Sequence, residues 1–344
     1  MREHFPLLEE CLYFNTAYTA PLSKALMQWR EEDDNTYLKT GDGYKLIHEK
    51  HYLEEARKAL AGFAGAEEHY TFITSNFTSA FQNFLIQLPP HFRFLSLKEE
   101  YPSLTGVIED LNFKTTLLPI TAKVEEAIWQ ELHQNDYEVL ALSAIQYSTG
   151  LYFDFAYLEK IKKAFPALII LIDGTQFLGA ESFSLTSSPV DAIFGSTYKW
   201  LMAGHGTGYA LFSSQLIERL HLNLEKLSSI YDRGQLSVKS IGSLLFAMEQ
   251  LLNTDFEHLM QHKKALTTLL FEGLKKRQLL DQTTLDRKKH SSIFTIQVNE
   301  EVYQKLLKNN VRCIQRGLGV RLSVHHYNNK EDIASLMAML DDMI

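Results

Sequence analysis

The stretch ALIILIDGTQ, residues 167–176, contains six consecutive apolar residues followed directly by an acid. An apolar run without polar alternation is typical of a strand that is covered on both faces, as in a parallel sheet between two layers of helices. A carboxylate at the end of such a strand is costly unless a cation or hydrogen-bond donors accompany it. The stretch therefore predicts a buried strand that ends at a functional Asp173, although an acid that caps a following helix would give the same pattern.

Six other short apolar runs are present, several of the seven are apolar on both faces, and amphipathic segments of helical period lie between some of them. Strand and helix in alternation predict an α/β fold with a mostly parallel sheet. The predicted strands are residues 71–75, 92–97, 115–120, 137–146, 167–173, 192–197 and 208–212, and the predicted helices among them are 78–88, 123–135 and 154–165.

The pattern changes after about residue 235. Two long helical segments come first, followed by a surface connection, a strand, a helix, two short strands and a final helix. These elements are predicted at 240–252, 257–277, 278–292, 291–298, 301–310, 311–315, 320–324 and 330–344. This order predicts a smaller α+β domain. We expect a large α/β domain at residues 20–235 and a small domain made of residues 1–19 and 236–344.

Composition excludes several classes of protein. The net charge of −8 disfavours a nucleic-acid partner, because binding a polyanion needs a basic surface. The longest apolar run is far shorter than a membrane span, and acidic residues stand in the N-terminal segment where a signal peptide needs an apolar core. The two cysteines, Cys11 and Cys313, have no metal-binding spacing. We therefore expect a cytoplasmic protein with no metal site and no membrane partner.

Side chains that can do chemistry follow three of the predicted strands, and ligands bind at the carboxyl ends of strands in an open α/β sheet. Lys199 follows one strand in the segment GSTYKWLMAGHGTGYALF (195–212), Asp173 ends another, and the turn 76–78 precedes a helix. Pyridoxal phosphate (PLP) needs an amine for a Schiff base, a carboxylate for its ring nitrogen and an anion seat for its phosphate. Each residue alone has an ordinary structural alternative, such as a surface lysine or a helix cap. The ordered set, with 26 residues from acid to amine, predicts a PLP site.

These motifs resemble the class V aminotransferase family of fold type I PLP enzymes, and the similarity extends nearly from end to end. The segment FITSNFTSAFQNFL (72–85) resembles the phosphate-turn block, and EYPS (100–103) resembles the block with the ring-stacking residue. IDGTQFLGA (172–180) resembles the ring-nitrogen block, and GVRLSVHHYNNKEDI (319–333) resembles the carboxylate-binding block. The resemblance implies a seven-stranded, mostly parallel sheet between helices, and a homodimer whose subunits share each active site.

The resemblance also implies roles for individual residues. Lys199 would form the Schiff base and transfer protons, and Asp173 would pair with the ring nitrogen. Gln176 would hydrogen-bond the phenolic oxygen of the cofactor, and Tyr101 would stack on its ring. The implied phosphate ligands are the turn Asn76, Phe77 and Thr78, together with Ser196, Tyr198 and, reaching from the neighbouring subunit, Gln235. The implied substrate-binding residues are Tyr147 and Arg321, whose planar guanidinium would bind the α-carboxylate.

Several positions depart from the residues that are common in the family. Tyr101 and Tyr198 stand where many members have histidine, Tyr147 stands where asparagine is expected, and Gln235 stands where threonine is usual. A cysteine desulfurase also needs a thiolate on a flexible loop ahead of the carboxylate-binding arginine. Cys313 lies inside a predicted strand instead, and we expect it to be a buried core residue.

The expected reaction is amino transfer between an amino acid and a 2-keto acid. An epimerase, a lyase or a cysteine desulfurase-like enzyme would use the same residues, so these alternatives stay open. A PLP-binding regulator without catalytic activity is a further alternative from a different class. Retention of Lys199, Asp173 and Arg321 together favours an enzyme, because unpaired buried charges are costly to keep.

Overall fold

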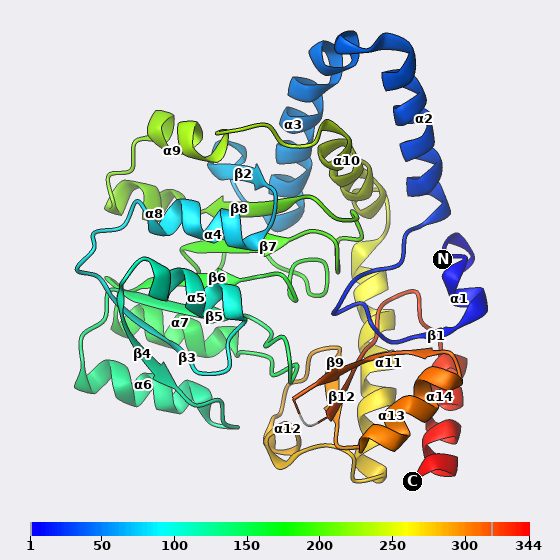
Figure 1. Ribbon diagram of the computed structural model, residues 1–344. Helices are drawn as coiled ribbons and strands as arrows, with labels where there is room; N and C mark the ends of the chain where they lie inside the picture. Colours follow the sequence, from blue (N-terminus) through cyan, green and yellow to red (C-terminus); the bar gives the residue numbers. More distant parts are fainter. Residues whose placement is uncertain (1, 318) are drawn as a thin grey trace.

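A seven-stranded sheet forms the centre of the protein, as the computed structural model of residues 2–317 and 319–344 shows (Figure 1). The strand order is β2-β8-β7-β6-β5-β3-β4. Strand β8 is antiparallel to both of its neighbours, and the other pairs are parallel. The strands are β2 (Thr71–Thr74), β3 (Arg93–Leu97), β4 (Lys114–Leu118), β5 (Val139–Ser143), β6 (Ile169–Asp173), β7 (Ala192–Ser196) and β8 (Gly208–Phe212). The predicted, mostly parallel seven-stranded sheet is confirmed.

Helices cover both faces of this sheet. Successive residues of a strand point to opposite faces, and along β6 Ile170 and Ile172 join one core whereas Ile169 and Leu171 join the other. The first core packs under α3 (Asp42–Ala64), α6 (Val124–Gln134), α7 (Phe155–Ala164) and α10 (Val238–Leu252). The second packs under α4 (Phe77–Leu85), α5 (Pro102–Asp110), α8 (Ser214–Arg219) and α9 (Leu224–Tyr231).

The C-terminal part has its own sheet and core. Its three-stranded antiparallel sheet has the order β11-β12-β9. The elements are α11 (Phe256–Lys276), α12 (Gln282–Asp286), β9 (Ile293–Ile296), α13 (Glu300–Lys308), β10 (Val311–Arg312), β11 (Ile314–Arg316), β12 (Gly319–Ser323) and α14 (Lys330–Met343). The segment predicted as one strand at 311–315 is split at Cys313, because β10 pairs with the N-terminal segment whereas β11 pairs with β12.

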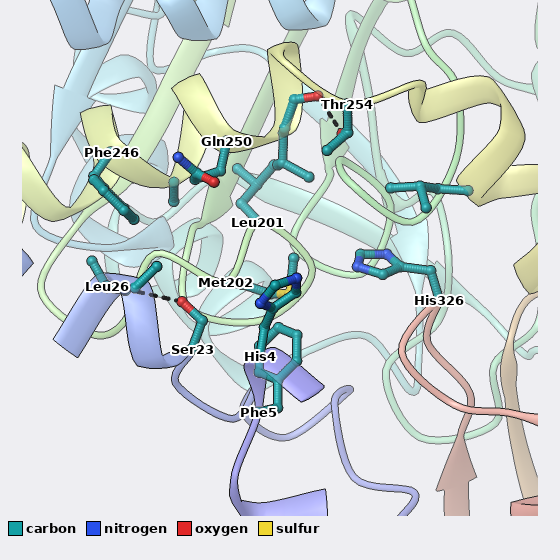
Figure 2. Close-up of a pocket in the computed structure, with 14 residues that line it drawn as sticks. His4, Phe5, Ser23, Leu26, Leu201, Met202, Phe246, Gln250, Thr254 and His326 are labelled. Carbon is teal, nitrogen blue, oxygen red and sulfur yellow. Dashed lines mark hydrogen bonds between the residues drawn. The ribbon is translucent and has the colours of Figure 1, made fainter. Parts of the chain in front are cut away.

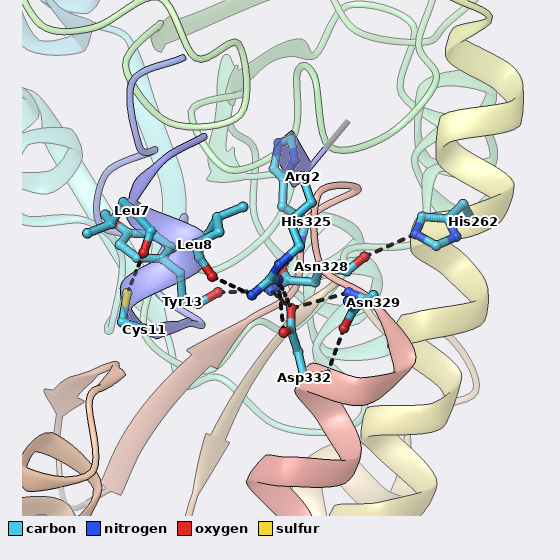
Figure 3. Close-up of polar contacts among 10 residues, drawn as sticks. All are labelled: Arg2, Leu7, Leu8, Cys11, Tyr13, His262, His325, Asn328, Asn329 and Asp332. Carbon is cyan, nitrogen blue, oxygen red and sulfur yellow. Dashed lines mark hydrogen bonds and ion pairs between the residues drawn. The ribbon is translucent and has the colours of Figure 1, made fainter. Parts of the chain in front are cut away.

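The N-terminal segment is bound to this C-terminal part. It contains a short 3₁₀ helix η1 (Arg2–His4), α1 (Leu7–Glu10) and β1 (Leu12–Tyr13), and β1 pairs in parallel with β10. Figure 3 shows the polar contacts that hold it: the Arg2 guanidinium donates to both carboxylate oxygens of Asp332, at 2.9 and 2.7 Å. The Asn328 amide also donates to the Tyr13 carbonyl, and Asp332 completes the capping box at the start of α14.

Two features differ from the sequence expectations. The stretch 278–292 is more than a surface connection, because Leu279 and Leu280 are buried in the C-terminal core and α12 follows them. Helix α10 packs on α3 and belongs to the core of the large sheet, although the predicted boundary at 235–236 places it in the small domain. We propose that the boundary lies between α10 and α11; the other predicted limits stay predictions, and Met1 lies outside the described residues.

Within the described ranges, no helix combines the length and the apolar composition needed to cross a bilayer.

Candidate functional site

One pocket lies where β5, β6 and β7 end, and it brings together eight of the residues predicted for the site. Parallel neighbours in a sheet end at the same edge, which is why side chains distant in sequence meet here. The predicted residues that line it are Phe77, Tyr101, Tyr147, Asp173, Gln176, Ser196, Tyr198 and Lys199, and Ser143, Ile145 and Thr175 line it as well.

Lys199 lies in the loop after β7 and is almost fully buried, with 8% of its surface exposed. No described residue makes a hydrogen bond or an ion pair with its amine, and Nζ lies 5.6 Å from the centre of the Tyr198 ring. Burial lowers the pKa of Lys199 from 10.5 to about 7; the charge of Asp173 opposes this shift, and Arg321 and Arg316 add to it. An amine with such a pKa is substantially neutral at physiological pH, as a nucleophile must be.

Asp173 is the last residue of β6 and is 6% exposed. Its Oδ1 accepts a hydrogen bond from the backbone N–H of Thr175 at 2.8 Å, and the Thr175 hydroxyl in turn accepts from the N–H of Ser196 at 3.2 Å. Burial raises the pKa of the Asp173 carboxyl, whereas the hydrogen bonds from Thr175 and the charge of Lys199 act in the opposite direction. A nearby cation would therefore stabilise the ionised form of this acid.

The residues predicted to bind the phosphate lie at the N-cap and in the first turn of α4. Asn76 is the N-cap, its Oδ1 accepts from the N–H of Ser79 at 2.9 Å, and its side chain is exposed. The N–H of Phe77 donates to Ser196 Oγ at 3.1 Å, which joins the start of α4 to the end of β7. A Cβ at Gly208 would lie 2.5 Å from the Asn76 carbonyl carbon, so only glycine permits this close approach. Thr78 is half-buried on the same turn, and the positive end of the helix faces the pocket edge that Phe77 and Ser196 line.

Aromatic rings form one wall of the pocket. Tyr101 lies directly before α5, and its ring makes edge contacts with Phe77, at 6.2 Å between centroids, and with Tyr147, at 5.5 Å. Tyr198 stacks on His205 at 4.5 Å, and burial raises the pKa of its phenol. Neutral phenols at these positions can stack and donate hydrogen bonds, but they bring no positive charge, unlike protonated histidine.

Gln176 connects the pocket to the N-terminal segment. Its Nε2 donates to the carbonyl of Ala17 at 2.8 Å, and its Oε1 accepts from the indole N–H of Trp200, also at 2.8 Å. Because Trp200 follows Lys199 directly, these bonds hold the lysine loop against the chain near Ala17. The predicted contact of Gln176 with the cofactor stays a prediction.

Arg321 lies on β12 of the C-terminal part and contacts Tyr147, which lines the pocket. It is 2% exposed, and its Nη1 donates to the carbonyl of Tyr147. Its Nε and Nη2 are buried and have no partner among the described residues. Burial lowers the pKa of the guanidinium to about 10, and the charge of Arg316 contributes further. Two unsatisfied donors on one planar cation can bind a carboxylate in a bidentate manner.

Two charged groups near the pocket escaped the sequence analysis. Glu100 is buried and accepts hydrogen bonds from the backbone N–H of Ser143, at 2.9 Å, and from its hydroxyl. Burial raises the pKa of this carboxyl to about 7, the bonds from Ser143 oppose the shift, and the charge of Asp173 adds to it. The sequence signal was a pair of adjacent glutamates before Tyr101, which ordinarily indicates a solvated turn. The second group, Arg316, stands only five residues before Arg321.

Gln235 does not line this pocket. It is exposed in the connection between α9 and α10, so its predicted contact with the site of a neighbouring subunit stays a prediction.

A second pocket is lined in part by the segment that follows Lys199 in the chain (Figure 2). Leu201 and Met202 of that segment face it, together with Phe246 from α10 and His326. Burial lowers the pKa of His326 to about 3, so its ring is neutral at physiological pH. Among the described residues that line this pocket there is no lysine, arginine or carboxylate, so it lacks the groups for amine chemistry.

Comparison with known proteins identifies the family. The Aminotransferase class-V family model matches residues 13–336. The chain belongs to the class-V aminotransferase family. A kynureninase from Saccharomyces cerevisiae is 26% identical over an alignment of 174 residues, and the match covers 44% of this chain and 38% of that protein. The match thus spans less than half the length of the kynureninase.

Solved structures of PLP enzymes have the same fold. The cystine C–S lyase C-DES, in complex with its reaction product cysteine persulfide, superposes with a TM-score of 0.87 at 17% identity, over 98% of this chain and 99% of that one. An apo cysteine desulfurase from Thermococcus onnurineus NA1 gives a TM-score of 0.82 at 18% identity, over 100% and 97%. A C-DES mutant that carries glycine covalently linked to the PLP cofactor gives 0.88 at 17% identity, over 99% of each chain. At these identities the likeness establishes the fold type I architecture.

The chain is thus a PLP-dependent class-V enzyme, and the residues of the Lys199 pocket fit that cofactor. A buried amine with a lowered pKa suits the PLP aldehyde, and a buried acid suits a protonated ring nitrogen. Gly208 of β8 packs closely against the start of α4. The N-terminus of that helix is suited to bind a phosphate. The two orphaned donors of Arg321 remain for a carboxylate.

Proposed function

We propose that this enzyme is an aminotransferase that moves an amino group between an α-amino acid and a 2-keto acid. The observation that supports this best is that Lys199 and Asp173 line one pocket, and that Arg321, which keeps two unpaired donors, bonds the carbonyl of Tyr147 in the same pocket. PLP supplies an aldehyde that bonds covalently to amines and a ring that accepts electrons from the substrate α-carbon.

The protein groups then have separable tasks. Lys199 Nζ holds the cofactor and afterwards moves a proton to and from the substrate α-carbon, for which its lowered pKa suits it near neutral pH. Asp173 keeps the ring nitrogen protonated, and Tyr101 is placed at the pocket wall to stack on the ring. The helix N-terminus at Asn76–Thr78, with Ser196 and Tyr198, holds the phosphate, and Gln176 donates to the phenolic oxygen. Arg321 and Tyr147 bind the substrate α-carboxylate.

A lyase is the second candidate, and it is favoured over a cysteine desulfurase by the state of the thiols. Cys313 is 6% exposed within the C-terminal core, and burial raises its pKa to about 12. Cys11 is also buried, and burial raises its pKa. Neither thiol can supply the accessible thiolate that persulfide chemistry needs, whereas elimination from an amino acid needs no protein thiol.

We further propose a cytoplasmic homodimer with a shared active site. Helices α2 (Lys24–Thr40) and α3 form a hairpin that extends from the body of the protein (Figure 1). Near its tip, Leu38 is 82% exposed, Leu46 80% and Ile47 64%. Apolar side chains gathered on an exposed element are typical of an interface, and a second copy of the chain would bury them.

A panel of amino acids distinguishes the candidate reactions. We would incubate the PLP-loaded enzyme with each amino acid and measure formation of the pyridoxamine form and the keto acid. Pyruvate with ammonia, accompanied by sulfide when the substrate is cysteine or by cysteine persulfide when it is cystine, would identify a lyase instead. Loss of optical activity alone would identify an epimerase. Bound PLP without any conversion in the whole panel would support the non-catalytic regulator and contradict the enzyme.

A further inference from the structure

Two arginines lie on the same face of the C-terminal hairpin beside the Lys199 pocket. Strands β11 and β12 are antiparallel, with Ile314 opposite Arg321 and Arg316 opposite Gly319. Residues 314 and 316 point to the same side of their strand, so Arg316 and Arg321 are diagonal neighbours on one face. Diagonal neighbours of this kind are about 7–8 Å apart, within reach of two long side chains.

Neither arginine has a counter-charge among the described residues. Arg316 makes no ion pair there, its Nε is buried without a hydrogen-bond partner, and its guanidinium lies over the ring of Tyr18, 5.7 Å from the centroid. The Arg321 guanidinium likewise makes no ion pair with any residue that the structure describes, and the single hydrogen bond it makes to them is to the neutral Tyr147 carbonyl. The positive charge of Arg316 also lowers the pKa of both Lys199 and Arg321, so all three cations lie within electrostatic reach of one another.

When the cofactor and a substrate with one carboxylate are bound, Arg316 still has no counter-charge in the described part of the chain. Asp173 is matched to the cofactor ring, and the phosphate seat lies at α4 with Ser196, which belongs to the large sheet. The substrate α-carboxylate satisfies Arg321 alone. A partly buried guanidinium that stays unpaired is costly, and an aliphatic substrate would add to that cost by excluding more water.

We propose that Arg316 binds a second carboxylate on the substrate, so that the preferred amino acid carries an acidic group distal to its α-carbon. The inference rests on the proposed function, because it takes Arg321 as the α-carboxylate ligand. Arg316 is then a specificity-determining residue. It attracts a diacid through a planar set of donors, and it rejects neutral side chains because they leave its charge unpaired.

The test measures binding of unreactive acids to the PLP-loaded enzyme by calorimetry. The probes are succinate, glutarate and adipate, each paired with the straight-chain monoacid of the same length. We expect at least one diacid to bind roughly 10- to 100-fold more tightly than its monoacid, the range that a charged hydrogen bond contributes. Arg316→Gln should abolish this preference while monoacid affinity is kept, and Arg316→Lys should keep part of it.

A matched control removes an exposed arginine from the adjacent β10. Arg312→Gln should retain the diacid preference, which excludes an effect of net charge alone. Unchanged monoacid affinity and thermal unfolding show that the Arg316→Gln pocket is intact. The proposal is overturned if the wild type shows no diacid preference, if Arg316→Gln keeps it, or if Arg316→Gln weakens monoacids and diacids equally.

The outcome is independent of whether amino transfer occurs. A diacid preference that depends on Arg316, combined with no conversion of any amino acid, would reject the proposed function and leave the second anion site standing. Conversion of neutral amino acids without a diacid preference would support the proposed function and reject the second anion site.

Discussion

The protonation state of Lys199 is the most direct test of the site, because burial moves its pKa from 10.5 to about 7. At pH 7 an amine with the ordinary pKa is neutral in only about 3 molecules per 10,000, whereas a pKa of about 7 makes roughly half of them neutral. The structure therefore predicts that Lys199 reacts with an aldehyde about a thousand times more often than its ordinary basicity would allow.

The assay follows covalent attachment of PLP to the apoprotein across a pH series. Borohydride stops each reaction, and mass spectrometry of the peptide that contains Lys199 gives the rate. We expect the rate to rise up to about pH 7 and then level off, because only the neutral amine attacks. Nα-acetyl-lysine, whose side-chain amine is free, should continue to gain rate to about pH 10 in the same buffers, and dividing the protein rate by this control rate removes the pH dependence of PLP itself.

Two variants should move the inflection in opposite directions. Asp173→Asn removes the negative charge that raises the pKa of Lys199, so the inflection should move down. Arg321→Met removes a positive charge that lowers this pKa, so it should move up. A wild-type rate that rises tenfold per pH unit through about pH 9 would refute the reasoning, because Lys199 would then have an ordinary pKa.

Three further predictions concern stability, the thiol and assembly. Lys199→Met should stabilise the apoprotein at pH 7 by an amount on the order of a few kcal/mol, and by less as the pH rises toward 10.5, because the unfolded chain binds more protons over that window. Urea unfolding measures this, and equal stability at pH 7 would contradict it. Cys313→Ser should leave kcat/KM on amino acids unchanged, since the thiol is buried; abundant persulfide on Cys313 after cysteine treatment would favour a desulfurase. Leu46→Asp should halve the mass measured by light scattering, and an unchanged dimer would place the interface elsewhere.

The large sheet was predictable because each of its strands can be recognised from a short apolar run of the sequence. Strands such as β6 are apolar on both faces, and the residue that ends or follows each of the mutually parallel strands lies at the same edge of the sheet. For this reason Asp173, Ser196 and Lys199 could be placed together from sequence alone. Their proximity needs only the parallel order of neighbouring strands, which the alternation of strand and helix implies.

The parts that were missed depend on contacts between distant segments. The division of 311–315 at Cys313 comes from the pairing of β10 with the N-terminal β1, which no local pattern announces. The sequence around Glu100 is typical of a surface acid, and its bonding partner Ser143 is 43 residues away in the chain. Arg316 and Arg321 are five residues apart in sequence, and only the β11–β12 register shows that they are diagonal neighbours on one face. Helix α10 has an apolar face that would suit either core equally well.

The two halves of the site are electrostatically coupled, and this has a consequence for proton transfer. Arg321 comes from the C-terminal part and lowers the pKa of Lys199, which the large sheet supplies. If Arg321 binds the substrate carboxylate, as proposed, that carboxylate neutralises the effect of Arg321 and raises the pKa of Lys199. With the proposed roles, the amine would be least basic when it must be neutral to attach the cofactor, and more basic when it must take a proton from the substrate. If Arg316 binds a second carboxylate, a diacid raises this pKa further than a monoacid does, and substrate preference then extends from binding to the rate of proton transfer.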